Sequence, residues 1–452
     1  MKAINPATDE LIKDYREHSE SEVIQIIDQV QTEYLKWRET SFAHRRELMH
    51  RAAAVLRKNI DRYARTMSME MGKIITEARA EIEKSAWVCE YYADNAETFL
   101  KDEIIETDAS RSFVAFEPLG IVLAVMPWNF PFWQVFRFAA PALMAGNAGI
   151  LKHASNVPGS ALAIEEAFHE AGFPKNIFRT LLISSSKVEN IIKNPLVKAV
   201  TLTGSETAGM QVAAAAGREL KKTVLELGGS DPFIVLEDAD VPACVLTSTK
   251  ARMLNVGQSC IAAKRFIVVE PLVKQFEEQQ TAIMTQLKVG DPLDENTKVG
   301  PMARLDLLEE LHEQVRKSIA LGARLLCGGK KADRPGAFYL PTVLANVKKG
   351  MPVYGEETFG PVSAIIPVKD TEDAIRVAND SEFGLGGSVW SRDIKKAEAV
   401  ARRIETGAMF INGMTKSDPR LPFGGVKKSG YGRELSHYGI REFVNIKTIW
   451  IA

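Results

Sequence analysis

The sequence has few cysteines, and they are widely spaced. Its four cysteines, Cys89, Cys244, Cys260 and Cys327, form no C-x-x-C pair, which argues against a zinc site or a disulfide framework. Residues 1–6 lack the basic start and apolar core of a signal peptide. We therefore expect no metal, and a reducing, cytoplasmic setting in which a thiol stays free.

The chain also lacks an excess of charge of either sign. Its 57 Lys and Arg side chains oppose 58 Asp and Glu, a formal net charge of −1. A protein without a net field does not gather nucleic acid or an anionic membrane surface at long range. We expect neither as a partner, with a local basic patch as the remaining alternative.

No apolar run is free of helix breakers. Residues 119–151 carry one formal charge, Arg137, but Pro127, Pro131 and Pro141 interrupt them. These prolines would leave backbone groups unsatisfied in lipid. A buried strand, a loop and a buried helix explain the stretch better, so we expect a soluble chain.

What the chain has is length and regular alternation. At 452 residues, with 46% hydrophobic and 25% charged residues, it is long enough for two or three lobes. Helical periodicity covers residues 21–37, with Ser21 as the expected N-cap, and then residues 44–60 and 74–100. Residues 103–117 and 443–451 alternate instead, which indicates strands that can pair with each other.

Short apolar strands alternate with helices through the rest of the chain. The expected strands between residues 120 and 235 are 121–126, 148–152, 177–182, 198–203 and 222–227. A second series follows residue 231. This alternation predicts an α/β fold with parallel, doubly wound sheets, whose ligands lie at the carboxyl ends of strands.

One cysteine and one glutamate stand beside glycines. Cys260 follows Gly257, and Glu226 precedes Gly228 and Gly229. A thiol and a carboxylate on neighbouring loops suit a covalent nucleophile and a general base. The alternatives are a small buried thiol and a solvated surface charge.

Three further segments can serve a ligand. Residues 203–209 follow a strand and open a helix, so their backbone N–H groups can receive phosphate, although a capped helix start explains this segment better when it is taken alone. Lys152 ends another strand and is either a ribose or phosphate ligand or a surface lysine. Asn129, between Pro127 and Pro131, is either an oxyanion donor or a turn cap.

Six segments together carry a resemblance. In chain order they are residues 127–131, 203–209, 225–230, 257–260, 356–361 and 422–425. In this order they resemble the aldehyde dehydrogenase superfamily, from about Asn5 to the C-terminus. The resemblance implies two Rossmann-like lobes with a small strand-based oligomerisation element. The dinucleotide-binding domain would comprise residues 1–102 and 119–228, the catalytic domain 229–438, and the oligomerisation strands 103–118 and 439–452.

The resemblance also implies the chemistry. Cys260 matches the nucleophile whose thiolate attacks the aldehyde to give a thiohemiacetal, and hydride transfer to the nicotinamide then leaves a thioester. Asn129 matches the oxyanion hole, together with the backbone N–H of Cys260. Glu226 matches the base that activates water for hydrolysis. The positions matching cofactor-binding residues are Trp128, Lys152, Ser155, Gly204, Ser205, Leu227, Glu357 and Phe359.

The resemblance implies that the cofactor is NAD or NADP. Many NAD-preferring relatives have a glutamate where this chain has Ser155. A carboxylate would repel a 2′-phosphate and a serine would not, so NADP is tolerated while NAD stays open.

The substrate assignment depends on Arg137. Relatives that oxidise succinate semialdehyde have an arginine here for the substrate carboxylate, and Ser417 and Phe423 match their substrate site. A helix arginine in a salt bridge is the alternative. A second arginine expected six residues before Cys260 is replaced by Leu254, and Arg252 is out of register. We expect succinate semialdehyde first and glutarate semialdehyde next.

Several alternatives stay open at this point. They are a broad-specificity or aromatic-aldehyde dehydrogenase, a variant that passes its acyl group to coenzyme A, and a non-catalytic binding protein. Glu226 argues against the coenzyme A variant, and an intact Cys260 argues against the binder. The two edge segments favour a homodimer or a homotetramer.

Overall fold

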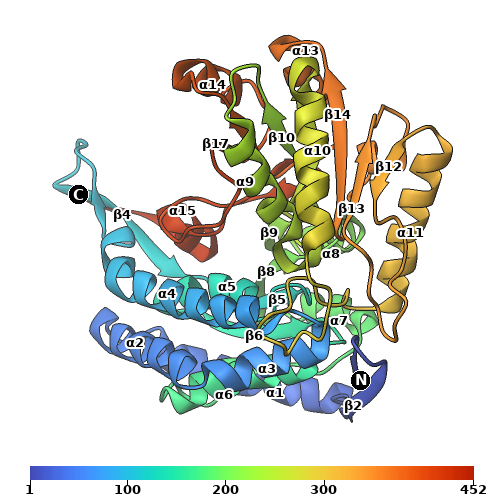
Figure 1. Cartoon of the computed structure of the whole chain (residues 1–452). Helices are drawn as coiled ribbons and strands as arrows, with labels where there is room; N and C mark the ends of the chain where they lie inside the picture. Colours follow the sequence, from blue (N-terminus) through green and yellow to red (C-terminus); the bar gives the residue numbers. More distant parts are fainter.

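The computed structural model describes residues 1–452 and begins with a hairpin and four helices. A two-stranded hairpin precedes the helices, which lie at the bottom of the view in Figure 1. The elements are β1 (Lys2–Asn5), β2 (Glu10–Asp14), α1 (Glu20–Trp37), α2 (Phe42–Lys58), α3 (Ile60–Met71) and α4 (Ile75–Phe99). The periodic pattern predicted α1, α2 and α4 but not α3 or the hairpin.

The predicted N-cap of the first helix was wrong. Ser19, not Ser21, caps α1: its side chain accepts a hydrogen bond from the N–H of Glu22, whose carboxylate accepts from the N–H of Ser19 at 2.7 Å. This reciprocal capping box satisfies two backbone donors, which a cap at Ser21 could not do.

A six-stranded sheet forms the first lobe. Its strand order is β19-β9-β8-β5-β6-β7, and all pairings are parallel except that of β19 with β9. The strands are β5 (Ile121–Met126), β6 (Ala148–His153), β7 (Phe178–Thr180), β8 (Val197–Thr203), β9 (Lys222–Glu226) and β19 (Gly430–Tyr431). The helices between them are α5 (Trp133–Met144), α6 (Pro158–Glu170), the short η1 (Ser185–Lys187) and α7 (Val188–Lys193), and α8 (Glu206–Arg218). The predicted parallel strands are confirmed within a few residues.

A seven-stranded sheet forms the second lobe, at the top of Figure 1. Its order is β12-β13-β14-β11-β10-β16-β17, parallel except for the edge pair β12–β13. The strands are β10 (Asp231–Val235), β11 (Ala263–Val269), β12 (Arg324–Cys327), β13 (Thr342–Ala345), β14 (Val362–Val368), β16 (Gly386–Trp390) and β17 (Ala408–Ile411). The helical elements are α9 (Val241–Met253), η2 (Leu254–Gly257), α10 (Glu270–Gln286), α11 (Leu305–Ala320), α12 (Pro352–Gly355), α13 (Thr371–Asn379) and α14 (Ile394–Ala401). The doubly wound α/β fold is therefore confirmed.

A third sheet projects from the first lobe, at the left of Figure 1. It has the order β20-β4-β3 and includes the C-terminal strand. Its strands are β3 (Glu103–Ile104), β4 (Arg111–Pro118) and β20 (Val444–Ile451); a short pair, β15 (Phe383–Gly384) with β18 (Val426–Lys427), and the helices α15 (Ser436–Ile440) and η3 (Arg441–Phe443) complete the fold. β20 pairs with β4 antiparallel from Val444↔Pro118 to Ile451↔Arg111, so the predicted pairing of the two alternating segments is confirmed.

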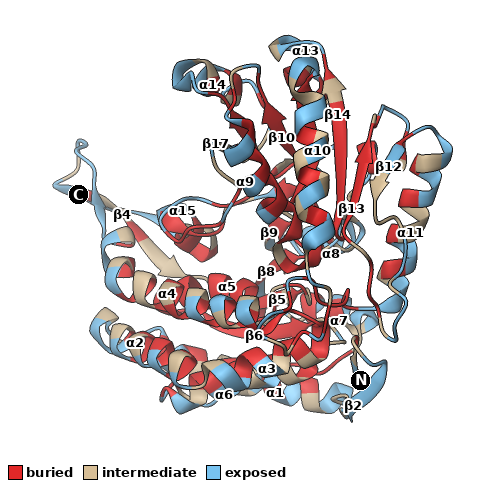
Figure 2. Ribbon diagram, in the orientation of Figure 1, coloured by how far each residue is buried: buried red, intermediate tan, exposed pale blue.

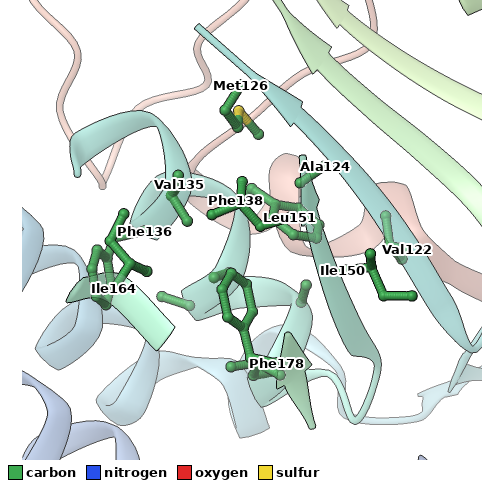
Figure 3. Packing of buried hydrophobic residues seen from close by; sticks show 14 of the residues in the cluster. Val122, Ala124, Met126, Val135, Phe136, Phe138, Ile150, Leu151, Ile164 and Phe178 are labelled. Atoms are coloured by element: carbon green, nitrogen blue, oxygen red, sulfur yellow. The ribbon is translucent and has the colours of Figure 1, made fainter. Parts of the chain in front are cut away.

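Each lobe has its own apolar core. In the first, side chains of β5, β6 and α5 pack together, as Val122, Ile150 and Phe138 illustrate in Figure 3. The inner strands of the second sheet, β10, β11, β13, β14 and β16, are buried almost throughout, whereas the edge strands β12 and β17 are not, and the outer faces of its helices are exposed (Figure 2). No helix of the structure combines the length and apolar character needed to cross a bilayer.

Candidate active site

The site lies between strand ends of the two sheets. The carboxyl ends of β5, β8 and β9 in the first sheet contribute the loops that begin at Pro127, Gly204 and Leu227. The second sheet contributes the segments that precede β11 and β14, which carry Cys260 and Glu357. The expected rule of carboxyl strand ends thus holds for the first sheet, whereas the second sheet presents its amino ends.

Strained backbone holds the loop before Cys260. Asn255 and Val256 have φ of 53° and 58°, in the left-handed region that costs a β-branched residue the most. Gly257 has φ of 76°, and a Cβ there would lie 2.2 Å from the carbonyl oxygen of Gly360. The Nη2 of Arg252 donates to the Gly257 carbonyl at 2.6 Å. Packing and hydrogen bonds therefore fix the course of the chain into Cys260.

Cys260 lines two cavities, one on each side of it. Desolvation raises the pKa of its thiol to about 12, against the attraction of Arg137 and Lys264 for the thiolate. The resting thiol is therefore neutral near pH 7, and attack on a carbonyl needs a route for its proton.

The side chain of Asn129 is buried and fixed beside this thiol. Its Nδ2 donates to the Gln258 carbonyl at 3.2 Å, and its Oδ1 accepts from Nε2 of Gln134 at 3.1 Å. A carboxamide has two N–H donors, so one remains for a further acceptor. Asn129 and Cys260 line the same cavity, an arrangement that suits an oxyanion formed next to the sulfur.

A buried ion pair on and beside α4 supports the Asn129 loop from behind. Lys73 pairs with Glu81 and donates to the backbone carbonyl of Asn129 at 2.8 Å. Glu81 in turn accepts the N–H groups of Phe132 and Trp133 at 2.9 and 3.0 Å, which caps the start of α5. The loop that carries the candidate oxyanion donor is therefore held by charge-assisted hydrogen bonds.

Glu226 ends β9 but lines neither cavity at Cys260. Its Oε1 lies 2.7 Å from the place a Cβ on Gly424 would occupy, and neither carboxylate oxygen has a hydrogen-bond partner. Burial and then the nearby Glu434 raise the pKa of Glu226 well above its usual range, against the effect of Arg137. The structure thus places this carboxyl deep in the site, in an environment that favours its neutral form.

The cavity on one side of Cys260 contains most of the predicted cofactor residues. They are Trp128, Gly204, Ser205, Leu227, Glu357 and Phe359. The rings of Trp128 and Phe359 meet edge to face at 5.7 Å. Ser205 caps α8, whose N-terminus therefore faces the cavity, and Glu357 accepts the N–H of Gly229 at 2.9 Å.

These groups fit a dinucleotide. Aromatic and aliphatic side chains suit a flat ring, the carboxylate of Glu357 suits sugar hydroxyls, and a helix N-terminus suits phosphate oxygens. Gly228 belongs to this fit, since a Cβ there would lie 2.6 Å from Oε2 of Glu357. When bound, the group accepts hydride from the substrate carbon.

Lys152 and Ser155 lie apart from that cavity. Lys152, at the end of β6, is buried, and desolvation lowers its pKa. Ser155 is exposed and lines a neighbouring cavity together with Lys2 and Arg304, where Arg304 is paired with Asp306. These two predicted cofactor-binding residues therefore do not line the cavity that the other six line.

The cavity on the other side of Cys260 contains all three predicted substrate residues, Arg137, Ser417 and Phe423. Arg137 is 3% exposed and forms an ion pair with Glu434, and its guanidinium stacks 4.7 Å from the Phe423 ring. Leu254 lines the cavity as an apolar residue.

Arg252 does not line this cavity. It is fully buried and bonds to the backbone carbonyls of Gly257 and Thr358. Both of the structural features expected for Arg137 are therefore present: it is a helix arginine in a salt bridge, and it borders the cavity next to Cys260.

Sequence reasoning missed Lys84 and Glu434. Lys84 of α4 lines the substrate-side cavity and donates to Oγ of Ser417 at 2.8 Å. The available signal was the spacing of Glu77, Glu81 and Lys84 at i, i+4 and i+7, a polar stripe on a helix with a long apolar face. Glu434 had no such signal, because only the fold brings it to Arg137.

Comparisons with known proteins agree with this geometry. The sequence profile of the Aldehyde dehydrogenase family matches residues 1–449. A probable succinate-semialdehyde dehydrogenase [NADP(+)] of Synechocystis is 53% identical over 452 residues, covering 100% of both chains. A succinate-semialdehyde dehydrogenase [NADP(+)] of Mycobacterium bovis is 50% identical over 455 residues, again covering 100% of both.

A crystal structure has the same fold. Succinic semialdehyde dehydrogenase from Streptococcus pyogenes, in complex with NADP+, superposes with a TM-score of 0.98 at 41% identity, covering 100% of this chain and 99% of that one. The predicted enzyme class and cofactor type are therefore confirmed: the chain belongs to the aldehyde dehydrogenase family and is an NAD(P)-dependent enzyme that oxidises an aldehyde.

Proposed function

We propose that this enzyme oxidises succinate semialdehyde to succinate and that NADP serves as the cofactor. The observation that carries the proposal is the position of Cys260 between two cavities of different chemistry. One suits a dinucleotide, and the other contains the cations Arg137 and Lys84. Relatives that match this chain over its whole length carry the name of that activity.

In the proposed mechanism Cys260 is the nucleophile. Its sulfur bonds to the aldehyde carbon while the thiol proton passes to a water molecule, and the electron pair of the C=O bond moves to the oxygen, which becomes an oxyanion. Asn129 donates its free N–H to that oxygen, together with the backbone N–H of Cys260. Because Gln134 and Gln258 already hold the amide of Asn129, its donor direction is set before the oxyanion forms.

Glu226 acts in the second half of the proposed reaction. The carbon bonded to sulfur must first lose a hydride, which a dinucleotide bound in the cofactor-side cavity would accept, so that the acyl group is held on Cys260 as a thioester. Water then attacks the thioester as Glu226 takes a proton from it, the C–S bond breaks, and Cys260 leaves as the thiolate. In the structure Glu226 lines neither cavity, so its side chain must turn from Gly424 toward Cys260 to reach that water. The raised pKa of Glu226 makes its ionised carboxylate a stronger base toward that water.

The cofactor assignment is supported by the cavity at Ser155. Lys2 and Arg304 line it together with Asp9 and Asp306, and no carboxylate stands at position 155 itself to repel a 2′-phosphate. We propose Trp128, Lys152, Ser155, Gly204, Ser205, Leu227, Glu357 and Phe359 as the cofactor-binding residues.

The domain boundaries at residues 1–102 with 119–228, at 229–438, and at 103–118 with 439–452 are also proposals. The passage of the chain from the first sheet to the second after β9 supports the boundary at residue 228.

We further propose a cytoplasmic homodimer or homotetramer. The free thiols suit a reducing compartment. Large apolar side chains on the projecting sheet are exposed, with Ile104 at 63%, Ile446 at 61% and Trp450 at 53%, as an association surface requires. Light scattering of the wild type against Ile446→Glu tests this, and a wild-type monomer contradicts it.

The functional proposal is tested with a panel of aldehydes and both cofactors. The panel contains succinate semialdehyde, glutarate semialdehyde, butanal and benzaldehyde. We expect the highest kcat/KM for succinate semialdehyde with NADP. A higher value for an uncharged aldehyde contradicts the substrate assignment, and a preference for NAD above about a hundredfold contradicts NADP use.

A further inference from the structure

The substrate-side cavity is lined by two cations, Arg137 and Lys84, and by two carboxyl groups, Glu77 and Glu81, of which Glu81 is paired with Lys73. Of the two cations, only one forms an ion pair. Arg137 is ion-paired with Glu434. Lys84 has no carboxylate oxygen within 4.0 Å of its Nζ, although it borders the same cavity as Cys260. A cation in a partly desolvated site without an anionic partner is costly, which points to an anion supplied from outside the chain.

The surroundings of Lys84 aim its ammonium into the cavity. The Nζ lies 4.1 Å from the centre of the Trp133 ring and donates one hydrogen bond, to Oγ of Ser417 at 2.8 Å. An ammonium has three N–H donors, so two remain. Burial, and then the charge of Arg137, lowers the pKa of Lys84 to about 8, against the weaker effects of Glu81 and Asp418. An incoming carboxylate would relieve both effects.

The relative positions of the two cations also matter. Arg137 lies deeper, between Glu434 and the ring of Phe423, and its guanidinium reaches Oγ1 of Thr203 at 3.4 Å. Its charge is already compensated, so it offers a substrate less net attraction than Lys84 does. Leu254, where a second arginine was expected, leaves the apolar wall of the cavity without a charge.

We propose that Lys84, together with Ser417, binds the carboxylate of the aldehyde substrate and supplies the second cation that position 254 lacks. This inference rests on the proposed function, because it assumes a carboxylate-bearing aldehyde. The ammonium and the hydroxyl form one anion-binding pair in the cavity that Cys260 also lines. Lys84 is then the residue that separates succinate semialdehyde from an uncharged aldehyde of the same length.

The test compares Lys84→Met with the wild-type enzyme, using succinate semialdehyde and butanal as substrates. We expect KM for succinate semialdehyde to rise about 10- to 100-fold, as for the loss of a hydrogen bond to a charged group. KM for butanal should change less than about threefold, because butanal has no carboxylate to bind. Lys84→Arg, which keeps the positive charge, should raise KM for succinate semialdehyde less than Lys84→Met does.

Lys101→Met is the matched control, since it removes an exposed positive charge just beyond the end of the same helix. Both KM values should stay at the wild-type level. If Lys84→Met does not fold, Lys84→Gln replaces it, and thermal unfolding and NADP affinity verify the fold. If Lys84→Met raises KM equally for both aldehydes, or leaves KM for succinate semialdehyde unchanged, the inference is overturned while the proposed function stays intact. A wild-type enzyme without preference for succinate semialdehyde over butanal overturns both.

Discussion

The two cavities at Cys260 are built in different ways. The cofactor-side cavity is lined mainly by segments that directly follow or precede sheet strands, with smaller contributions from α5 and α11. The carboxylate of Glu357 in this cavity accepts from the N–H of Gly229 and lies 3.6 Å from Lys264. The substrate-side cavity is lined largely by side chains of α4 and α5, and it contains an unpaired lysine. The sheets therefore set one side by backbone position, whereas helix surfaces set the other by side-chain choice. Substitutions on the two sides should therefore change different kinetic constants, those for the aldehyde on one side and those for the cofactor on the other.

Glu226→Gln should have the largest effect of the four substitutions below and should act on both substrates alike. Steady-state turnover is expected to fall about 10³-fold, the scale of a lost general base, while a first burst of reduced cofactor persists. Stopped-flow absorbance measures both phases. A lost burst would mean that Glu226 acts before acylation.

The same variant tests a pH dependence. Burial and Glu434 raise the pKa of Glu226, so in the wild type more of its carboxyl ionises as pH increases, and hydrolysis should accelerate through that range. The Gln variant should lack this increase in its residual turnover. A turnover that falls with rising pH near neutrality contradicts the assignment.

Asn129→Ala should reduce kcat about 100-fold for charged and uncharged aldehydes, because it removes one oxyanion donor. NADP affinity, followed by fluorescence, should stay near the wild-type value. A loss confined to succinate semialdehyde would instead assign Asn129 to substrate recognition.

Arg137→Met should act on the substrate side and on stability. It leaves the buried carboxylate of Glu434 without its partner, which typically lowers the free energy of unfolding by about 3–5 kcal/mol. KM for succinate semialdehyde should rise about tenfold. Denaturant unfolding and kinetics measure the two effects, and Arg137→Met with Glu434→Gln is the matched double variant. An unchanged KM would assign Arg137 to structure alone.

Ser155→Glu should have the smallest effect and should act on the cofactor side only. A carboxylate at this exposed position repels a 2′-phosphate, so KM for NADP should rise about tenfold while KM for NAD stays the same or falls. Paired kinetics with the two cofactors measure this. Equal changes for both would place residue 155 outside the 2′-phosphate environment.

The contrast between the cavities explains how much the sequence could predict. Parallel strands such as β5 and β8 were predictable, because short apolar runs bounded by turn residues mark them. Ser19 was also within reach, since Ser19 and Glu22 have the capping-box spacing. The antiparallel β19 was not, as it is two residues long and pairs with β9 across about two hundred residues.

The site followed the same division. Residues such as Glu357 and Ser205 belong to short sequence motifs that resemble those of the family, so the resemblance located them. Lys84 lies on a helix whose local pattern reads as packing, and its neighbour Ser417 is 333 residues away in the chain. Glu434 and Arg137 are likewise joined only by the fold. Contacts of this kind arise from tertiary packing, which no local periodicity encodes.

The measurement that tests the account most directly is mass spectrometry of the acyl-enzyme. Glu226→Gln is mixed with succinate semialdehyde and NADP, quenched in acid and digested. We predict a succinyl adduct on Cys260 and none on Cys89, Cys244 or Cys327. An adduct on another cysteine, or rapid cofactor reduction with no covalent adduct at all, would contradict the central claim that Cys260 joins the two cavities as the nucleophile.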